Sequence, residues 1–226
     1  MKKILLVAAT DLELRPFFDF LGPLAVDKTG PGMYEKDDRQ LRICITGAGM
    51  MQSAAHIMEA VMAFQPDVAL QAGIGGSFDL DLPLGSLLLV GQEMAGDIGA
   101  EDEEGFTPIA DMGFADKDAF PFRDGWLDSS FPDWPCLKDL PRVKGLTVNT
   151  ISGISRTIEQ RRRRYGCVVE SMEGAAFHYV CLCKKIPFVQ LRAVSNYVEP
   201  RNKDRWEIGK AVNNLNDWLR THIFTI

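Results

Sequence analysis

A small number of charged and amide side chains stand in apolar surroundings, and these residues are the best suited to chemistry. In VQLRAVSNYVEPR, Arg192 interrupts an apolar run that ends in Ser195 and Asn196. In VVESMEGAAF, Glu170 and Glu173 lie three residues apart. A buried guanidinium needs a carboxylate partner, and a buried carboxylate needs a cation. The sequence therefore predicts that Arg192 pairs with an acid, Glu173 being the first candidate, in a structural or a ligand-binding role.

Ordinary structural roles compete with these chemical ones. Acids in the first turn of a helix complement the helix dipole, which is worth only ~0.3–1 kcal/mol, and this explains one of Glu170 and Glu173 more easily than both. Glu13, in AATDLELRPF, taken alone fits a solvated position on an amphipathic helix better than a catalytic one. Asn196 fits a cap on a turn.

Strand and helix patterns alternate along the chain that carries these residues. Apolar runs of strand length occupy residues 4–9, 41–46, 67–72, 87–92, 145–148 and 188–194. Apolar residues at helical spacing occupy 12–21, 53–65, 172–183 and 204–220. This alternation predicts an α/β fold, a three-layer sandwich around a mixed, largely parallel sheet. Because no repeat or linker interrupts it, residues 1–226 are predicted to form a single domain.

Two glycine-rich segments follow predicted strands, GAGM after residues 41–46 and GIGGS after residues 67–72. Both are predicted to be turns at the carboxyl edge of the sheet, where open α/β sheets bind ligands. Either turn alone is explained by backbones that pass closely, whereas two at one edge favour a ligand cradle. Neither carries the GxxxxGK pattern of a phosphate loop.

Residues 99–144 break the alternation, because they are rich in Asp, Glu, Gly, Pro and Phe and show little periodicity. A long irregular segment inside a compact fold is usually a lid, a binding loop or an interface arm. We expect this segment to have one of these roles.

The composition excludes several classes of protein. A net charge of −6 without a basic stripe argues against nucleic-acid binding, and Arg161–Arg164 is expected to end a helix. The three histidines lack metal-ligand spacing, so no metal is predicted. Five scattered cysteines without a CxxC pair are typical of reduced core thiols. The apolar part of MKKILLVAAT is too short for a secretory or membrane-spanning segment, which predicts a cytoplasmic protein without membrane association.

Five motifs resemble the purine nucleoside phosphorylase/uridine phosphorylase superfamily in their order and approximate spacing: AATDLE, TGAGM, PDVALQAGIGGS, VESMEGAAF and VQLRAVSN. They are most similar to its nucleosidase branch, typified by the methylthioadenosine/S-adenosylhomocysteine nucleosidases. Within that branch, GDIGAEDEEGF, TVNTISG and RAVSNYVEPR resemble the futalosine hydrolases of menaquinone biosynthesis. The resemblance spans nearly the whole chain. It implies a nucleoside phosphorylase-like fold, a small nucleoside substrate, no cofactor, and a homodimer or larger homo-oligomer.

The resemblance also implies roles on the sugar side of a nucleoside. Glu13 matches the acid that activates the attacking water, and Glu173 matches the glutamate that binds the ribose hydroxyls, with Met172 packed against the sugar. Arg192 matches an arginine below the ribose pocket. The loop beside the ribose corresponds to Gly73, Ile74 and Gly75.

On the base side, Ile154 falls near the purine-stacking position, and a phenylalanine of the adenine-releasing relatives aligns at about Gly153. Asn196 is the main departure, because those relatives carry an aspartate general acid there. An amide can donate to the carbonyl oxygen of a 6-oxopurine and accept from a protonated N7, whereas a carboxylate repels that carbonyl. The prediction is therefore hydrolysis of the N-glycosidic bond of futalosine to hypoxanthine and dehypoxanthine futalosine. This reaction needs a base for water and donors for the departing purine.

Three other functions stay open: a methylthioadenosine-type nucleosidase, a nucleoside phosphorylase that uses phosphate, and a non-catalytic member of the fold that binds nucleosides or stores nitrogen. The joint presence of Glu13, Glu173 and Arg192 weighs against the last.

The binding of the benzoate end of futalosine is also open. The acidic residues Asp97 and Glu101–Glu104 would repel a benzoate unless they face solvent or a neighbouring subunit. Arg15, Arg123 and Arg201 are the candidate cations, and the sequence does not choose among them.

Overall fold

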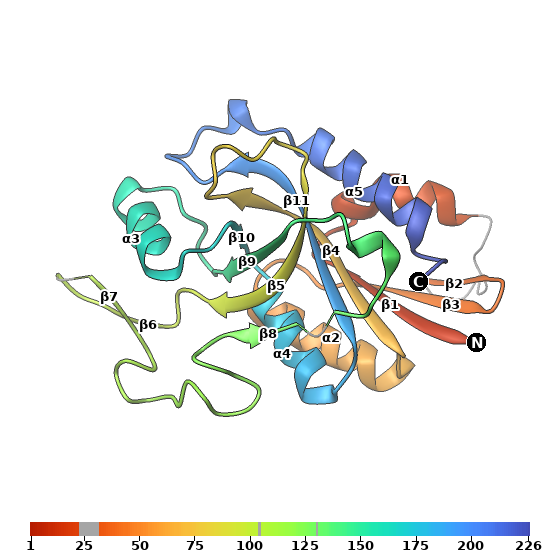
Figure 1. Cartoon of the computed structure of the whole chain (residues 1–226), viewed down its shortest axis with the longest axis horizontal. Helices are drawn as coiled ribbons and strands as arrows, with labels where there is room; N and C mark the ends of the chain where they lie inside the picture. The colour runs from red at the N-terminus through yellow and green to blue at the C-terminus, as the bar shows by residue number, and fades with distance from the viewer. Residues whose placement is uncertain (23–31, 104, 130) are drawn as a thin grey trace.

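One central sheet carries most of the strands (Figure 1). The structure is a computed structural model that describes residues 1–22, 32–103, 105–129 and 131–226. The strands of the main sheet are β1 (Lys2–Ala8), β2 (Met33–Lys36), β3 (Arg39–Ile45), β4 (Val68–Ser77), β5 (Leu87–Ala95), β8 (Leu127–Asp128), β9 (Arg142–Thr147), β10 (Val169–Ser171) and β11 (Phe188–Tyr197). The helices are α1 (Asp11–Leu21), α2 (Met50–Phe64), α3 (Ser155–Tyr165), α4 (Gly174–Lys184) and α5 (Ile208–His222).

The sheet is mixed and closes on itself at one end. Its strand order is β10-β9-β5-β11-β4-β1-β3-β2, β8 pairs with β5, and β10 also pairs with β4. Because β10 reaches both β9 and β4, these strands form a ring with β5 and β11. Among the described strands of this main sheet, five pairings are parallel and four are antiparallel. The predicted mixed, largely parallel sheet is confirmed.

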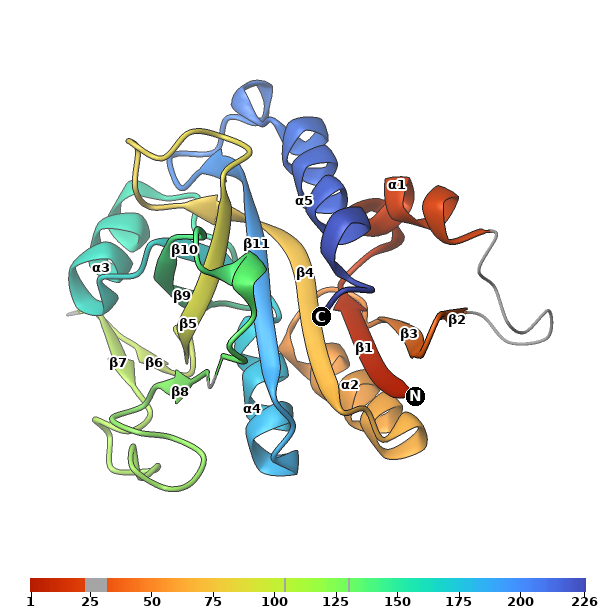
Figure 2. The same ribbon diagram turned by 45° about the vertical axis from the view of Figure 1, so that its right-hand side comes forward.

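Helices cover both faces of the sheet, and β1 shows why. It is a continuous apolar run whose alternate residues enter two different cores. Ile4 and Leu6 pack with α1 and α5, whereas Leu5 and Val7 pack with α2 and α4. Figure 2 shows the two helix pairs on opposite sides of the strands. The predicted three-layer α/β sandwich is therefore correct.

GIGGS, which was predicted to be a turn, is part of β4. Residues 73–77 continue the strand, because β11 pairs with them on one side and Glu170 of β10 pairs with Gly76 on the other. GAGM does turn, with φ of +77° at Gly47 and +95° at Gly49. The ligand cradle that was predicted to consist of two turns therefore consists of one turn, GAGM, and the glycine-containing end of strand β4.

Several predicted boundaries also shift. Glu170 lies in β10 rather than in a helix, Met172 precedes α4, and Glu173 is the N-cap residue of α4. The last helix starts at Ile208 after a short 3₁₀ turn at Lys203–Arg205. β2 and α3 were not predicted as elements, although the arginine run does end α3 as expected.

The segment 99–144 is irregular, as predicted. It holds the two-stranded hairpin β6 (Gly99–Glu101) and β7 (Phe106–Pro108), then β8 and a 3₁₀ turn at Pro135–Leu137. It ends in the first residues of β9. Glu104, one of the predicted acidic residues, lies outside the described residues.

No described helix combines the length and the apolar content needed to span a bilayer. Among the described residues, no group of three His, Cys, Asp or Glu side chains is arranged to hold a metal ion. All five cysteines are free thiols.

Candidate active site

Arg192 is the centre of a buried charged cluster between β11 and β4. It is 1% exposed and lies opposite Gly73 in the parallel ladder. Its Nη1 donates to the Ile74 carbonyl at 3.4 Å and to Glu173 Oε2 at 3.5 Å, and its Nη2 donates to Gln71 Oε1 at 3.2 Å. The predicted pairing of Arg192 with Glu173 is therefore present.

Gly73 gives this cluster its space. A Cβ at Gly73 would lie 2.4 Å from Arg192 Nη1 and 2.9 Å from Glu13 Oε1, so any larger residue would displace one of the two charged groups. The glycine lets a guanidinium and a carboxylate approach the same point of the backbone. Gly73, Ile74 and Gly75, which match the loop beside the ribose in the related family, therefore lie in strand β4, whose Gly73 lies directly against the charged cluster.

Glu13 reaches the cluster from the first turn of α1. It occupies the third helical position, and its Oε2 accepts from the backbone N–H groups of Ala9 and Thr10, both at 3.0 Å. Its Oε1 accepts from the N–H of Ile74 at 3.0 Å. The Thr10 hydroxyl also donates to Oε2, at 3.5 Å. Each carboxylate oxygen offers about two acceptor positions, so Oε1, whose one described donor is Ile74, keeps a position open for a ligand.

Burial raises the pKa of the Glu13 carboxyl above its ordinary value, and the nearby Glu173 adds to the rise. The Arg192 guanidinium and the Ile74 and Thr10 N–H groups oppose it. A raised pKa makes the carboxylate a better base, because the ideal pKa of a general base lies near the working pH. Glu13 has the environment of a proton acceptor.

Glu173 is held by the turn that follows β3. Its Oε1 accepts from the backbone N–H of Gly49 at 3.2 Å, while its Oε2 faces Arg192. The side chain is 5% exposed, and Met172 beside it is half-buried. Two of its acceptor positions are occupied, which leaves about two for ligand hydroxyls.

Asn196 stands just beyond a bulge in β11. The register with β4 shifts at Ser195, between the Val194–Gly75 and Asn196–Gly76 pairs. Such bulges re-aim a side chain and are common beside active sites. Ser195 Oγ donates to Asn196 Oδ1 at 2.8 Å, and Asn196 Nδ2 donates to the Tyr197 carbonyl at 3.0 Å. The amide keeps one N–H and one oxygen lone pair for a ligand.

Ile154 is the predicted site residue that the structure leaves outside this cluster. It is 70% exposed and is the N-cap residue of α3. The structure brings together Glu13, Gly73, Ile74, Glu173 and Arg192, places Gly75 and Asn196 on the adjoining part of the β4–β11 pair, and joins Ile154 to them by no described contact.

Glu170, the other acid of VESMEGAAF, has a different task. Its Oε1 accepts from the backbone N–H of Ser152 at 2.8 Å, and its Oε2 accepts from the Ser152 hydroxyl at 2.5 Å. Arg161 Nη1 donates to the same Oε2 at 3.2 Å. Glu170 therefore fixes the loop that leads to Ile154.

Sequence reasoning missed four polar residues around Arg192. Gln71 and Gln190 lie opposite each other in the β4–β11 ladder, each amid apolar neighbours, and that isolation was the available signal. Glu93 is fully buried one residue beyond the predicted end of the strand at 87–92, and Thr147 bonds to it.

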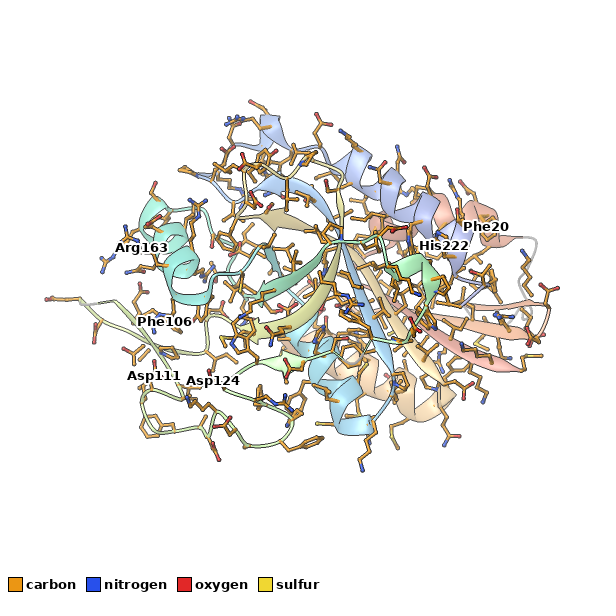
Figure 3. All side chains as sticks on the ribbon, viewed as in Figure 1. Phe20, Phe106, Asp111, Asp124, Arg163 and His222 are labelled. Atoms are coloured by element: carbon orange, nitrogen blue, oxygen red, sulfur yellow. The ribbon has the colours of Figure 1, made fainter. Side chains whose placement is uncertain are left out.

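A cavity of about 1010 Å³ lies between the β6–β7 hairpin and α3. Figure 3 marks two of its lining residues, Phe106 and Arg163. Its described lining contains Asn149 and Thr150, from the loop that Glu170 fixes, but none of the nine predicted site residues. The charges of its lining are mixed, because it contains both acids (Asp97, Glu101 and Asp102) and arginines (Arg161, Arg163 and Arg164).

Comparison with known proteins finds one family model and several relatives that this chain resembles. The model of the phosphorylase superfamily matches residues 4–222. A futalosine hydrolase of Streptomyces coelicolor is 34% identical over 158 residues, which are 67% of this chain and 63% of that protein. A futalosine hydrolase of Thermus thermophilus is 34% identical over 178 residues, 75% of each chain. The match thus spans less than two thirds of the S. coelicolor protein.

Solved structures show the same fold at lower identity. The native structure of futalosine hydrolase of Helicobacter pylori has a TM-score of 0.81 and 17% identity, with 100% of this chain and 98% of that chain covered. The 5′-methylthioadenosine/S-adenosylhomocysteine nucleosidase of H. pylori, crystallised with butyl-thio-DADMe-Immucillin-A, has a TM-score of 0.82 and 17% identity, with 100% and 99% covered.

Proposed function

Because the chain belongs to the phosphorylase superfamily, we propose that it is a purine nucleosidase that hydrolyses the N-glycosidic bond of futalosine. The products are hypoxanthine and dehypoxanthine futalosine, a step of menaquinone biosynthesis. The likeness to futalosine hydrolases of two organisms at 34% identity supports this substrate. A third futalosine hydrolase, from Acidothermus cellulolyticus, is 28% identical.

The observation that carries the proposal is the arrangement of two carboxylates around one buried guanidinium. Glu13 and Glu173 both approach Arg192 beside Gly73, and each keeps acceptor capacity unused. Buried polar groups normally have at least one hydrogen-bond partner, yet the Nε–H of Arg192 has none among the described residues. Spare capacity at three adjoining charged groups is what a site for water and sugar hydroxyls requires.

Glu13 is the general base in this mechanism. It takes one proton from a water molecule whose oxygen forms a bond to C1′ of the ribosyl group while the C1′–N9 bond breaks. The electron pair of that bond leaves with the purine, and one proton from solvent, added at N7, completes hypoxanthine. Burial, which raises the pKa of Glu13, favours this proton transfer.

Glu173 and Asn196 act on the two halves of the substrate. Glu173 accepts hydrogen bonds from the ribose diol, and these strengthen as the ring flattens toward an oxocarbenium ion. Asn196 donates its free N–H to the purine O6, onto which the leaving charge spreads. Its free lone pair accepts from a protonated N7. Gly73, Ile74, Gly75, Met172 and Ile154 bind the sugar and base in this scheme, and Arg192 holds Glu173 in place.

The experiment that tests the proposal is a nucleoside screen with detection of the released base. Wild-type protein should release hypoxanthine from futalosine and leave methylthioadenosine essentially untouched. Heat-denatured protein is the control. Faster release of adenine from methylthioadenosine than of hypoxanthine from futalosine would show that the protein is instead a methylthioadenosine-type nucleosidase.

A phosphorylase is distinguished by its need for phosphate. A dianion beneath the sugar needs cations or convergent N–H groups, whereas here Glu13 presents a carboxylate and engages the Ile74 N–H. We expect turnover to be unchanged when phosphate is removed, with free sugar as product. A ribose-1-phosphate-type product would contradict hydrolysis.

We also propose that the protein is a cytoplasmic homodimer or larger homo-oligomer that needs no cofactor. Five free thiols suit a reducing compartment, and Phe114 and Phe120 of the segment 99–144 are 76% and 72% exposed, as expected of an interface arm. Light scattering on a sizing column should give a mass at least twice 25.2 kDa. A monomer would contradict the assembly.

A further inference from the structure

Glu93 is a fully buried carboxyl that the proposed mechanism does not use. It lies in β5 with its Oε2 against two glycines. A Cβ would come within 2.3 Å of this oxygen at Gly174 and within 2.4 Å at Gly145. Gly174 is the first residue of α4 and directly follows Glu173. The carboxyl of Glu93 therefore fills the space beneath the start of α4.

Hydrogen bonds tie Glu93 to that helix start. Thr147 Oγ1 donates to Glu93 Oε1 at 2.9 Å, and the Ala175 N–H donates to Thr147 Oγ1 at 2.7 Å. On its other side, Glu93 Oε2 accepts from Gln190 Nε2 at 3.0 Å. A shift of Glu93 would thus move the first turn of α4 and the Glu173 side chain with it.

The buried series of hydrogen-bonding side chains continues from Gln190 to His178, and a donor hydrogen is missing between these two residues. Gln190 Oε1 and His178 Nε2 have no partner among the described residues, although the two side chains interact. His178 Nδ1 lies 3.0 Å from the Leu127 carbonyl, so Nδ1 carries a hydrogen. Nε2 of a neutral imidazole is then an acceptor, and two acceptors cannot bond to each other.

One additional proton gives each unpaired polar atom of the Glu93–Gln190–His178 series a hydrogen-bond partner. This proton can lie on either end of the series. On His178 it would lie at Nε2 and donate to Gln190 Oε1. On Glu93 it would donate to Gln190 Oε1 once the amide turns over, and Gln190 Nε2 would donate to His178 Nε2. Burial lowers the pKa of His178 to about 4 and raises the pKa of Glu93 to about 7, so the proton belongs on Glu93.

Burial is the largest influence on Glu93, and it raises the pKa of this carboxyl against the opposing effects of Arg192 and of the hydrogen bonds from Thr147 and Gln190. Arg192 of β11 favours its ionised form, whereas Glu173 at the start of α4 disfavours it, and Cys167 also faces it. Asp128 of β8 faces His178. An ionised Glu93 would be a third carboxylate around one guanidinium, in competition with Glu13 and Glu173 for Arg192.

We propose that Glu93, Gln190 and His178 share one buried proton, and that protonated Glu93 is a positioning residue that holds the start of α4 and therefore Glu173. This rests on the proposed role of Glu173 in binding the ribose. The protonation itself does not, so the two parts have separate tests.

The first test measures kcat and KM for futalosine as a function of pH. The KM of the wild type should rise as pH passes through about 7, because ionised Glu93 loses its donor and repels Glu173. Glu93→Gln keeps an N–H donor and stays neutral, so its KM should match the wild type within about threefold at pH about 6 and lack that rise. Glu93→Ala should raise KM at every pH, with a smaller effect on kcat.

Glu170→Gln is the matched control, since it makes the same change at a buried acid outside the Glu93–Gln190–His178 series. Its KM should still rise as pH increases through about 7, as in the wild type. Loss of activity by more than about a hundredfold in Glu93→Gln, or an unchanged alkaline rise in that variant, would overturn the positioning role.

The second test needs no substrate. The pKa of Glu93 in the folded protein, about 7, lies above its ordinary value of 4.5, so the folded state binds more protons than the unfolded state between these pH values. Wild-type stability should therefore fall relative to Glu93→Gln as pH rises through this window, and level off above it. The Tm of Glu93→Gln minus that of the wild type should grow by several °C from pH about 5 to about 8.

An infrared difference spectrum at neutral pH gives a direct view of the same proton. The carbonyl band of a protonated carboxylic acid should be present in the wild type and absent from Glu93→Gln. A constant Tm difference without that band would show that Glu93 is ionised and would end the proposal, whether or not futalosine proves to be the substrate.

Discussion

Glu170 and Glu173 lie three residues apart, are each 5% exposed, and each face a mostly buried arginine, yet their surroundings differ. Glu170 accepts from the backbone and the side chain of Ser152 and from Arg161, over 2.5–3.2 Å. Among the described residues, the Glu173 carboxylate accepts only from the Gly49 N–H at 3.2 Å and from Arg192 at 3.5 Å. The two carboxylates are therefore equally buried, but Glu173 has fewer and longer hydrogen bonds than Glu170.

The two arginines repeat this difference. Arg161 Nη1 donates to Thr150 O and Ser152 Oγ at 2.9 Å and to Glu170 at 3.2 Å, and Asp97 lies within 3.9 Å. Arg192 makes contacts of 3.2–3.5 Å, and its Nε–H has no partner among the described residues.

A structural ion pair differs from a ligand-binding one in how many of its hydrogen-bond donors and acceptors are already used within the protein. The Arg161 pair has little capacity left, so it holds the loop at residues 149–152 in place. The Arg192 pair keeps donors and acceptors unused, at an energetic cost that a structural role alone does not explain. We therefore infer that the Arg192 cluster is built for a ligand.

The largest expected effect on activity comes from Glu13. Glu13→Gln keeps the shape of the side chain and removes its basicity, so kcat should fall by roughly two to four orders of magnitude. Circular dichroism should show an unchanged fold. Turnover near that of the wild type would remove Glu13 from the mechanism.

A change of specificity is expected at Asn196. Asn196→Asp replaces the N–H donor to O6 with a repelling carboxylate, so hypoxanthine release from futalosine should fall by about two to three orders of magnitude, as when a transition-state donor is lost. Some adenine release from methylthioadenosine should appear, because an aspartic acid can protonate N7 of an adenine. Unchanged preference between the two substrates would show that Asn196 only caps the strand.

At the Arg161–Glu170 ion pair, a substitution should lower the stability of the protein and leave its catalytic rate nearly unchanged. Arg161→Met leaves Glu170 and Asp97 without their cation, which should lower the free energy of unfolding by about 3 kcal/mol, or Tm by roughly 6–12 °C. The kcat should stay within a few-fold of the wild type.

Arg163→Met is the control for Arg161, because the Arg163 side chain is 79% exposed and, within the part of the chain that the structure describes, forms an ion pair only with Glu159. Its effect should stay within about 0.5 kcal/mol. A larger loss of kcat than of stability in Arg161→Met would contradict a purely structural role for this pair.

The sequence predicted the fold because its strands are continuous apolar runs between amphipathic helices, and β1 with α1 is the clearest case. It also predicted the pairing of Arg192 with Glu173, since a lone cation in an apolar strand admits few partners. It misjudged GIGGS as a turn. Glycines were assumed to bend the chain, whereas Gly73 is a glycine because two charged groups press against it.

Other features of the site depend on long-range packing that local patterns do not contain. The contrast between Glu170 and Glu173 arises from Ser152 and Gly49, which lie 18 and 124 residues away in the chain. The ring closed by β10 and the buried position of Glu93 likewise follow from the order of strands in the sheet.

The most direct measurement of the central claim is kcat/KM for futalosine in Glu173→Gln and Glu170→Gln, compared at a temperature where both are folded. The substitution, the burial and the region of chain are matched, and only the saturation of the carboxylate differs. We predict that Glu173→Gln loses at least about a hundredfold, since hydrogen bonds to the ribose are worth several kcal/mol in the transition state, while Glu170→Gln stays within about threefold. Equal losses in the two variants, or a larger loss in Glu170→Gln, would contradict the account.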